Sequence, residues 1–319
     1  MNEDILILQK LAITKQLNFL IGSGASVPAI PLMGTFSDTP EKKAVEQLKE
    51  KIYKVSSDLI LNNLNENTTK TLDSYQHFIE CLISLMNKSN SRQTPRNINI
   101  FTTNYDLFIE KSIDNIIQNT RLIFNDGASG YFNRILDSSN YNRVVSYKGI
   151  NDNYIDEIPS ISLLKPHGSV NWSKINENII VHSNLAEMTE MIFVEPNGLE
   201  GQNTFLNNHF HEILRSFQIE LDKPQSILIV TGFSFQDQHI AKMVKRALQN
   251  SELLIYIFAY SDNDKKIILN NLSLSGERTN LKIITPEESG NIPITLNRLT
   301  YFLSGKYAEE EKINESKTT

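Results

Sequence analysis

Short apolar runs that end in a polar or glycine-rich turn recur along this chain and alternate with stretches of helical periodicity. The first run is LNFLIGSGAS at 17–26, and NINIFTTN at 97–104 and ISLLKPHGSVNW at 161–172 follow it. QSILIVTGFSFQDQHIAKMVKRAL at 225–248 and LLIYIFAY at 253–260 repeat the pattern. Buried parallel strands read as near-continuous apolar runs, and a crossover helix must separate them. The alternation therefore predicts an α/β fold with a Rossmann-like parallel sheet and helices on both faces.

Two insertions and a tail interrupt this alternation. Apolar residues recur every three or four positions at about 40–96, which predicts two inserted helices. The segment 127–160 is polar and turn-rich, which predicts short strands, loops or a small subdomain. We therefore expect one domain over 1–303 and a disordered tail over 304–319. Further predicted elements are strands at 191–196 and 281–285, a helix from Asp106, and a helix marked by Leu206, Phe210, Ile213 and Phe217.

The composition limits the function classes. The chain of 319 residues has 31 Lys and Arg against 37 Asp and Glu, so its net charge of −6 predicts no direct nucleic-acid binding. Cys81 is the only cysteine, which excludes an intramolecular disulfide and an all-cysteine zinc module and favours a reducing cytoplasm. No apolar run reaches the roughly 20 residues of a membrane span, and the N-terminus is too acidic for a signal peptide.

The ends of four predicted strands carry unusual residues, and a parallel sheet would bring these ends to one edge. In GSGAS, the turn from Gly22 to Ser26 allows backbone N–H groups and a helix N-terminus to approach a pyrophosphate. A tight turn without a ligand is the alternative, because this loop lacks the complete dinucleotide-binding fingerprint.

Side chains at the other three strand ends suit catalysis or binding. In KPHGS, His167 is a candidate general base because histidine as a residue type has a pKa near neutrality, with a hydrogen-bonded turn histidine as the alternative. In TTNYD, Asn104 could fix a sugar hydroxyl or a water, or it could cap a helix starting near Tyr105. Ser234 in GFSFQD could bond phosphate or ribose, whereas Asp237 is expected to cap the next helix.

A metal site is not expected. His209 and His211 are two positions apart, which places them on different faces of a predicted helix and excludes a zinc pair.

The motifs GSGAS, TTNYD, KPHGS and GFSFQD, in this order and spacing, together resemble the sirtuin superfamily, specifically bacterial sirtuin-like NAD-consuming domains. The resemblance covers most of residues 17–262. It implies that Asn104 lies beside the nicotinamide ribose of NAD and that His167 is the catalytic base. The NAD-contacting positions it implies are Gly22, Gly24, Ala25, Ser26, Thr103, Asp106, Gly232 and Ser234, with Ser261 and Asp262 near the adenosine.

The chain departs from protein-deacylating sirtuins, whose small domain usually carries a four-cysteine zinc module. The expected function is therefore that of an NAD glycohydrolase, which needs no metal and releases nicotinamide and ADP-ribose. The resemblance further implies a role in anti-phage defence by NAD depletion. It also implies a homo-oligomer that a partner controls, such as a hexameric HerA-like ATPase. Two alternatives stay open: a protein deacylase or ADP-ribosyltransferase, and a non-catalytic sensor that binds NAD or ADP-ribose.

Overall fold

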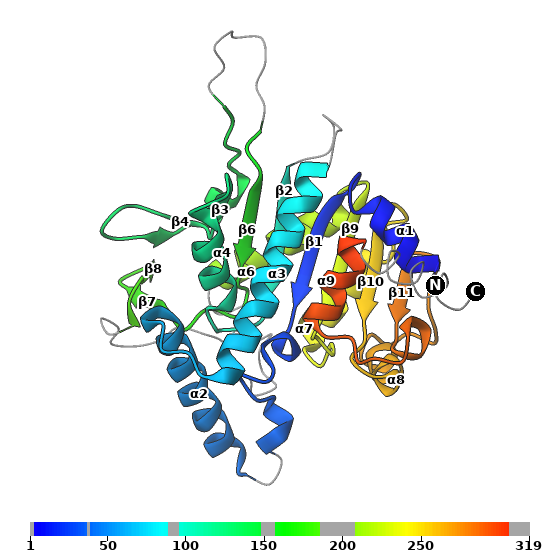
Figure 1. Ribbon diagram of the computed structural model, residues 1–319, viewed down its shortest axis with the longest axis horizontal. Coiled ribbons are helices and arrows are strands. Elements are labelled where there is room, and N and C mark those ends of the chain that lie inside the picture. Colours follow the sequence, from blue (N-terminus) through cyan, green and yellow to red (C-terminus); the bar gives the residue numbers. More distant parts are fainter. Residues whose placement is uncertain (1–2, 37–38, 89–95, 148–156, 186–207, 306–319) are drawn as a thin grey trace, which may run out of the picture.

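A seven-stranded parallel sheet forms the centre of the computed structural model, which describes residues 3–36, 39–88, 96–147, 157–185 and 208–305 (Figure 1). The strand order is β11-β10-β9-β1-β2-β6-β3, and every neighbouring pair is parallel. The strands are β1 (Gln16–Ile21), β2 (Asn97–Thr102), β3 (Ile123–Asn125), β6 (Ser160–Leu164), β9 (Ser226–Thr231), β10 (Leu254–Phe258) and β11 (Leu281–Ile284). The predicted Rossmann-like α/β fold is confirmed.

Helices cover both faces of the sheet because the strands are apolar on both sides. Along β1, Phe19 and Ile21 belong to one buried cluster, and Leu20 between them belongs to the other. The first cluster receives α1 (Glu3–Leu11), α2 (Glu41–Leu61), α3 (Glu66–Lys88), α4 (Phe108–Ile117) and α9 (Leu296–Ser304). The second receives α6 (Asn208–Asp222), α7 (Gln238–Ala247) and α8 (Asp262–Asn271). The protein is thus a three-layer helix–sheet–helix sandwich.

The register of the strands brings their carboxyl ends to one edge. Ile21 at the end of β1 pairs with Thr102 of β2 and with Thr231 of β9. Leu164 at the end of β6 pairs with Phe101 of β2. The strands β6, β2, β1 and β9 are neighbours, so their following loops lie side by side. We call these the first loop (22–26), second loop (102–106), third loop (165–169) and fourth loop (232–237).

The order of the strands also places a switch point beside β1. The chain passes from β1 to β2 on one side, and later strands β9 and β10 add on the other side. Loops after β1 and β9 therefore leave in opposite directions, and such a point is where open α/β sheets bind ligands.

A second, four-stranded sheet stands beside the first. It contains β4 (Ala128–Ser129), β5 (Ile135–Leu136), β8 (Asn178–Val181) and β7 (Trp172–Ile175), paired antiparallel in that order. Its first two strands fall in the predicted irregular segment, where Asn140 donates from Nδ2 to the Gly127 carbonyl oxygen at 2.7 Å. The polar residues of this segment therefore hold turns together, which explains why they show no sustained periodicity.

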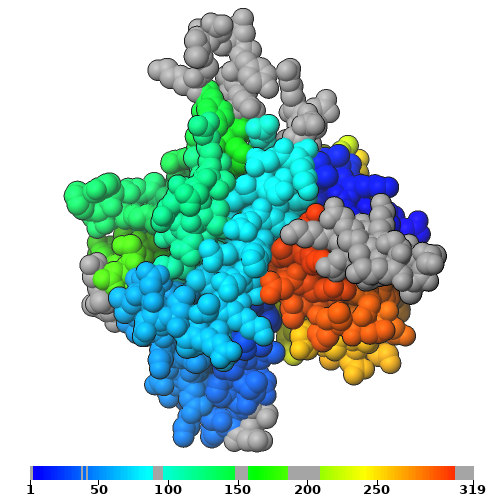
Figure 2. Space-filling view, in the orientation of Figure 1, coloured from blue at the N-terminus to red at the C-terminus, as the bar shows by residue number. Residues whose placement is uncertain are grey.

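The two predicted inserted helices are present as α2 and α3. Tyr75, Phe78, Ile79 and Leu82 form a fully buried stripe on α3 at helical spacing. Helix α3 packs against α4 and α9, and Figure 2 shows it in cyan beside the orange-red α9. None of the described helices is long and apolar enough to span a membrane.

Some predicted segments lie outside the described residues, and one predicted boundary differs from the boundary that the structure shows. The predicted strand at 191–196 lies outside the described residues, as does 306–319 of the predicted tail. Ser304, where that tail was predicted to begin, is instead the last residue of α9, and Gly305 caps the helix with a φ of 82°.

The contact between α3 and β1 yields a stability prediction. Phe78 is fully buried and packs edge-on against Phe19, with ring centroids 5.1 Å apart. We expect Phe78→Ala to lower the free energy of unfolding by roughly 3–5 kcal/mol, because it leaves a cavity between helix and sheet. Urea unfolding followed by circular dichroism measures this loss. The exposed Tyr53→Ala on α2 is the control, and equal losses in both variants would contradict the packing described here.

Candidate functional site

The glycines of the first and fourth loops let the two backbones touch. Gly24 N donates to the Gly232 carbonyl oxygen at 3.0 Å. A Cβ on Gly22 would lie 2.4 Å from that same oxygen, and a Cβ on Gly232 would lie 2.5 Å from Ala25 N. Gly232 also has a φ of +64°, which favours glycine. Close approach of loops therefore accounts for these glycines, and their contact with a pyrophosphate stays a prediction.

The helix N-terminus expected after the first loop is shorter than predicted. Only a 3-10 turn forms over Ser23–Ser26. Pro28 and Pro31 follow within five residues, and proline cannot continue a helix because it lacks a backbone N–H. The long helix of a full dinucleotide-binding motif is thus absent from this loop, and the N–H groups of Gly22, Gly24 and Ala25 already donate to carbonyl oxygens of the protein.

Asn104 of the second loop is buried, and its amide nitrogen is fully occupied. Nδ2 donates to the Gly22 carbonyl oxygen at 3.0 Å and to Ser26 Oγ at 3.1 Å. A carbonyl oxygen can only accept, so the orientation of the amide is fixed. Helix α4 begins at Phe108, whose N–H donates to Asp106 Oδ1 at 3.3 Å, so Asn104 does not cap it. The Oδ1 atom of Asn104 is buried and has no donor among the described residues.

Ser26 and Asp106 form the next hydrogen bonds behind the Asn104 amide. Ser26 Oγ donates to Asp106 Oδ2 at 2.7 Å, and both residues are buried. Burial raises the pKa of the Asp106 carboxyl, although Lys165 and these hydrogen bonds oppose the rise. Tyr75 of α3 places its hydroxyl 3.0 Å from Ser26 Oγ. These polar side chains contact each other, and the predicted contacts of Ser26 and Asp106 with NAD remain untested.

Lys165 joins the third loop to the second. Its ammonium is buried, lies 2.6 Å from Glu110 Oε1, and donates to the Asp106 carbonyl oxygen at 2.6 Å and to Ser169 Oγ at 2.9 Å. Val170 N also donates to the Tyr105 carbonyl oxygen at 2.9 Å. The loop that carries His167 is thereby fastened to the loop that carries Asn104.

His167 of the third loop contacts the fourth loop through Asp237. Nε2 of His167 lies 3.0 Å from Asp237 Oδ2, and both side chains are at most 9 % exposed. The other oxygen of Asp237 caps α7 by accepting from the N–H groups of His239 and Ile240. Burial raises the pKa of Asp237, but His167 and the two N–H groups outweigh burial and lower it overall. Asp237 therefore stays a carboxylate that can orient the His167 ring.

Together the four loops form a ring of contacts. The first touches the second through Asn104, the second touches the third through Lys165, the third touches the fourth through His167, and the fourth touches the first through Gly232. The structure thus brings together the four motifs that the sequence singled out. It also adds Tyr75, Lys165 and Asp237 to the candidate site.

Other predicted contact positions lie around this ring and have structural partners. Thr103 N donates to the Ile21 carbonyl oxygen at 3.2 Å. Ser234 is exposed, and its carbonyl oxygen accepts from Asn271 Nδ2 at 2.7 Å. At the start of α8, Ser261 donates from N and Oγ to Asp264, and Asp262 Oδ1 accepts from Glu287 N. Ligand contacts of these positions remain predictions.

The remaining histidines do not assemble a cation site in the described part of the chain. His209 packs edge-on against Trp172, with centroids 5.8 Å apart, and burial lowers its pKa to about 4. No group of three His, Cys, Asp or Glu side chains among the described residues is placed to hold a metal ion.

The fold and the ring of loops define an α/β protein with polar, buried functional groups at the carboxyl edge of a Rossmann-like sheet. The chain belongs to the SIR2-like domain family, whose model matches residues 98–278. The match includes the second, third and fourth loops. No curated protein matches the chain. Family membership supports an NAD-related, sirtuin-type function and suggests an NAD-utilising enzyme.

The ion pair between buried Lys165 and partly buried Glu110 gives a stability prediction that depends on pH. Lys165→Met leaves the Glu110 carboxylate without its partner, so we expect a loss of about 3–5 kcal/mol in unfolding free energy near neutral pH. Burial already raises the pKa of Glu110 and Lys165 opposes that rise, so the substitution raises this pKa further. A carboxyl with a raised folded-state pKa stabilises the fold when protonated, and this contribution is lost as pH rises through that pKa.

The deficit of Lys165→Met should therefore be larger at about pH 8 than at about pH 5. Urea titrations at the two pH values measure it. The double variant Lys165→Met/Glu110→Gln is the matched control, and it should recover the part of the loss that comes from the unpaired Glu110 but not the part that comes from the lost hydrogen bonds to Asp106 and Ser169. A deficit that is the same at both pH values would rule out the pairing as its cause.

Proposed function

We propose that the protein is an NAD glycohydrolase that cleaves NAD to nicotinamide and ADP-ribose. In this reaction the bond between the nicotinamide ring nitrogen and C1′ of the ribose breaks, and nicotinamide leaves with the electron pair. A water oxygen bonds to C1′, and the proton of that water passes to a base. The transition state resembles an oxocarbenium ion, so the site must hold the ribose and place the water.

The observation that carries this proposal is the buried Oδ1 of Asn104, which has no donor among the described residues. A buried amide oxygen without a donor costs about 1–3 kcal/mol, so a hydrogen bond from a ligand or a water would offset this cost. The Nδ2 contacts to Gly22 and Ser26 hold the side chain in one orientation. Oδ1 is therefore preorganised to accept a hydrogen bond from a ribose hydroxyl or from the attacking water.

The contact between His167 and Asp237 supports a general-base role. Because Nε2 faces the carboxylate of Asp237, Nδ1 is the nitrogen left to take a proton from water or from a ribose hydroxyl. The carboxylate would then stabilise the imidazolium that forms. Asp237 is a positioning residue in this scheme, because it acts through His167.

Two substitutions test the chemistry. We expect Asn104→Ala and His167→Ala each to lower nicotinamide release from NAD by about 10²- to 10⁴-fold, the usual contribution of a positioned acid–base group. Chromatography of nicotinamide and ADP-ribose after incubation with NAD measures it, with and without the protein encoded by the neighbouring gene. The exposed Lys54→Ala serves as the control.

The pattern of results separates the competing functions. Undiminished release in His167→Ala would exclude His167 as the base. Tight NAD binding by the unaltered protein with no release under either condition would favour a sensor instead. Nicotinamide release that requires an acylated peptide or another protein acceptor would favour a deacylase or ADP-ribosyltransferase.

Asp237→Asn tests the positioning role without removing the helix cap, because Asn is also a good N-cap residue. Loss of the carboxylate removes the charge that orients the His167 ring and would stabilise the imidazolium, so kcat for nicotinamide release should fall at least about tenfold while KM for NAD changes little. Steady-state kinetics with NAD separate the two constants. An unchanged kcat, or a fall in kcat that is matched by a loss of thermal stability, would assign Asp237 to structure alone.

The cellular role is proposed from the resemblance to bacterial sirtuin-like domains. In that role the protein acts in the cytoplasm as a homo-oligomer and depletes NAD during phage infection. A partner such as a HerA-like hexameric ATPase would control it. Comparison of NAD levels in infected cells carrying the unaltered protein or His167→Ala tests the role, and equal levels would contradict it.

A further inference from the structure

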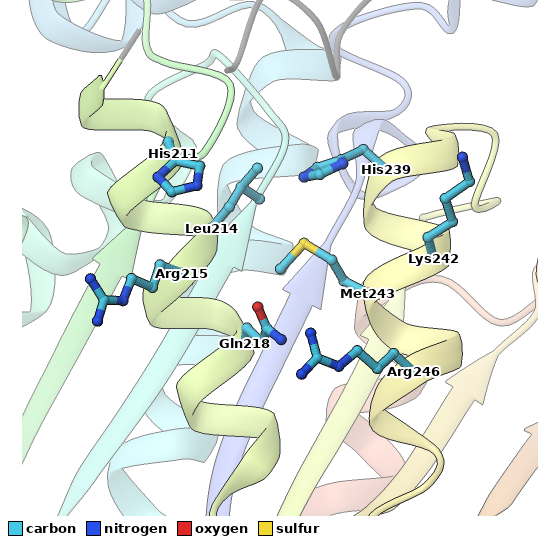
Figure 3. A pocket seen from close by; sticks show the side chains of 8 residues that line it. All are labelled: His211, Leu214, Arg215, Gln218, His239, Lys242, Met243 and Arg246. Carbon is cyan, nitrogen blue, oxygen red and sulfur yellow. The ribbon is translucent and has the colours of Figure 1, made fainter. Parts of the chain in front are cut away.

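A groove of about 480 Å³ runs between α6 and α7, on the sheet face opposite to α3 (Figure 3). One wall carries four residues at helical spacing on α6, and the other carries four on α7. The lining residues are His211, Leu214, Arg215, Gln218, His239, Lys242, Met243 and Arg246. Among the described residues, the lining of the groove thus contains three permanent cations and no carboxylate, in a chain whose net charge is −6.

The three cations of this groove form no ion pair with the acids of the described residues. Arg215, Lys242 and Arg246 are exposed, and none of them takes part in the ion pairs formed between described residues. Unpaired like charges on facing walls repel each other, and an anion between the walls would relieve that repulsion. Arginine in addition binds phosphate oxygens through two parallel hydrogen bonds.

The rest of the groove suits the non-phosphate part of a ligand. Leu214 is buried at its base, and Figure 3 shows the Met243 side chain pointing into it between the two helices. Figure 3 also shows Arg246 reaching toward Gln218, whose amide offers both a donor and an acceptor. An apolar floor with one amide beside several cations matches a planar heterocycle joined to phosphates, and the volume is in the range of small-molecule sites.

We propose that this groove binds a nucleoside polyphosphate, with its phosphates on Arg215, Lys242 and Arg246 and its base over Leu214 and Met243. The groove lies outside the ring of four loops, although α7 connects the two. The N-cap of α7 is Asp237, which contacts His167, and His239 of the groove is two residues further along. The site is therefore distinct from the proposed NAD site but shares a helix with it.

A binding measurement on the full chain tests the proposal. The probe is ATP labelled on its ribose with a fluorescent group, titrated with protein in the presence of saturating ADP-ribose to fill the proposed NAD site. The double variant Arg215→Glu/Arg246→Glu should bind the probe at least about tenfold more weakly, because two charge-assisted contacts become repulsive. The control Lys54→Glu/Lys266→Glu changes the net charge equally at exposed positions on α2 and α8, and it should bind within about twofold of the unaltered protein.

Competitors then identify the ligand class. Unlabelled ATP should displace the probe at least about tenfold better than inorganic pyrophosphate, because the base adds apolar contact. Equal binding by both charge variants would place the probe elsewhere and overturn the proposal. Equal competition by pyrophosphate would overturn the base site. Stronger competition by a single-stranded oligonucleotide or by a polyglutamate peptide would overturn it in favour of a nucleic acid or an acidic partner. This test does not depend on NAD cleavage, so its result is separate from that of the proposed function.

Discussion

The geometry of the candidate site depends on one buried ammonium group. Lys165 Nζ lies within 3 Å of Glu110, of the Asp106 carbonyl oxygen and of Ser169 Oγ, and these groups come from α4, the second loop and the third loop. A buried charge is stable only when paired and hydrogen-bonded, so the positions of all three partners are specified together. Asn104 is two residues from one of these partners, and His167 is two residues from Lys165 itself. The hydrogen bonds and the ion pair of buried Lys165 therefore help to fix the positions of Asn104 and His167 relative to each other.

Most polar side chains of the four loops are used to build the site, and few are left for a ligand. Ser26, Tyr75 and Asp106 satisfy each other and hold the Asn104 amide nitrogen. Asp237 divides its two oxygens between a helix cap and His167. Among the buried polar side chains described in these loops, the Asn104 oxygen has no donor, and the exposed Ser234 also keeps its hydroxyl toward solvent, so both can contact a ligand.

The arrangement of the strands could be predicted from the sequence because each buried parallel strand is a short apolar run that ends in polar residues. The convergence of four such ends on one edge then follows from parallel pairing alone. Short strands were predicted within 127–160, and β4 and β5 lie there, but their pairing with β8 and β7 could not be predicted because strands of two residues such as Ala128–Ser129 carry no periodicity. The short terminal helices α1 and α9 were missed for a similar reason, since nine residues contain few helical repeats.

The structure adds Tyr75, Lys165 and Asp237 to the site, and for each of them the sequence indicates only part of what the side chain contacts. Tyr75 belongs to the apolar stripe of α3, and nothing in that stripe indicates that its hydroxyl reaches Ser26. Asp237 precedes a helix and was correctly predicted as its cap, but a carboxylate has a second oxygen whose partner depends on the tertiary fold. Lys165 is part of the KPHGS motif, but its burial depends on the packing of α4 against the third loop, which the sequence does not show. The one sequence signal for a buried, bonded Lys165 is its position two residues before the proposed base His167.

The central position of β1 has a consequence for how the molecule is made. Strand β1 is completed by residue 21, but its partner β9 spans residues 226–231, so the two halves of the central pair are separated by most of the chain. Such a long loop must close before the sheet can gain its middle hydrogen bonds. During synthesis, a nascent chain that has not yet reached the fourth loop lacks one arc of the ring and the acid that faces His167. The ring of contacts can therefore close only after residues 232–237 have been synthesised, long after the first and second loops have been made.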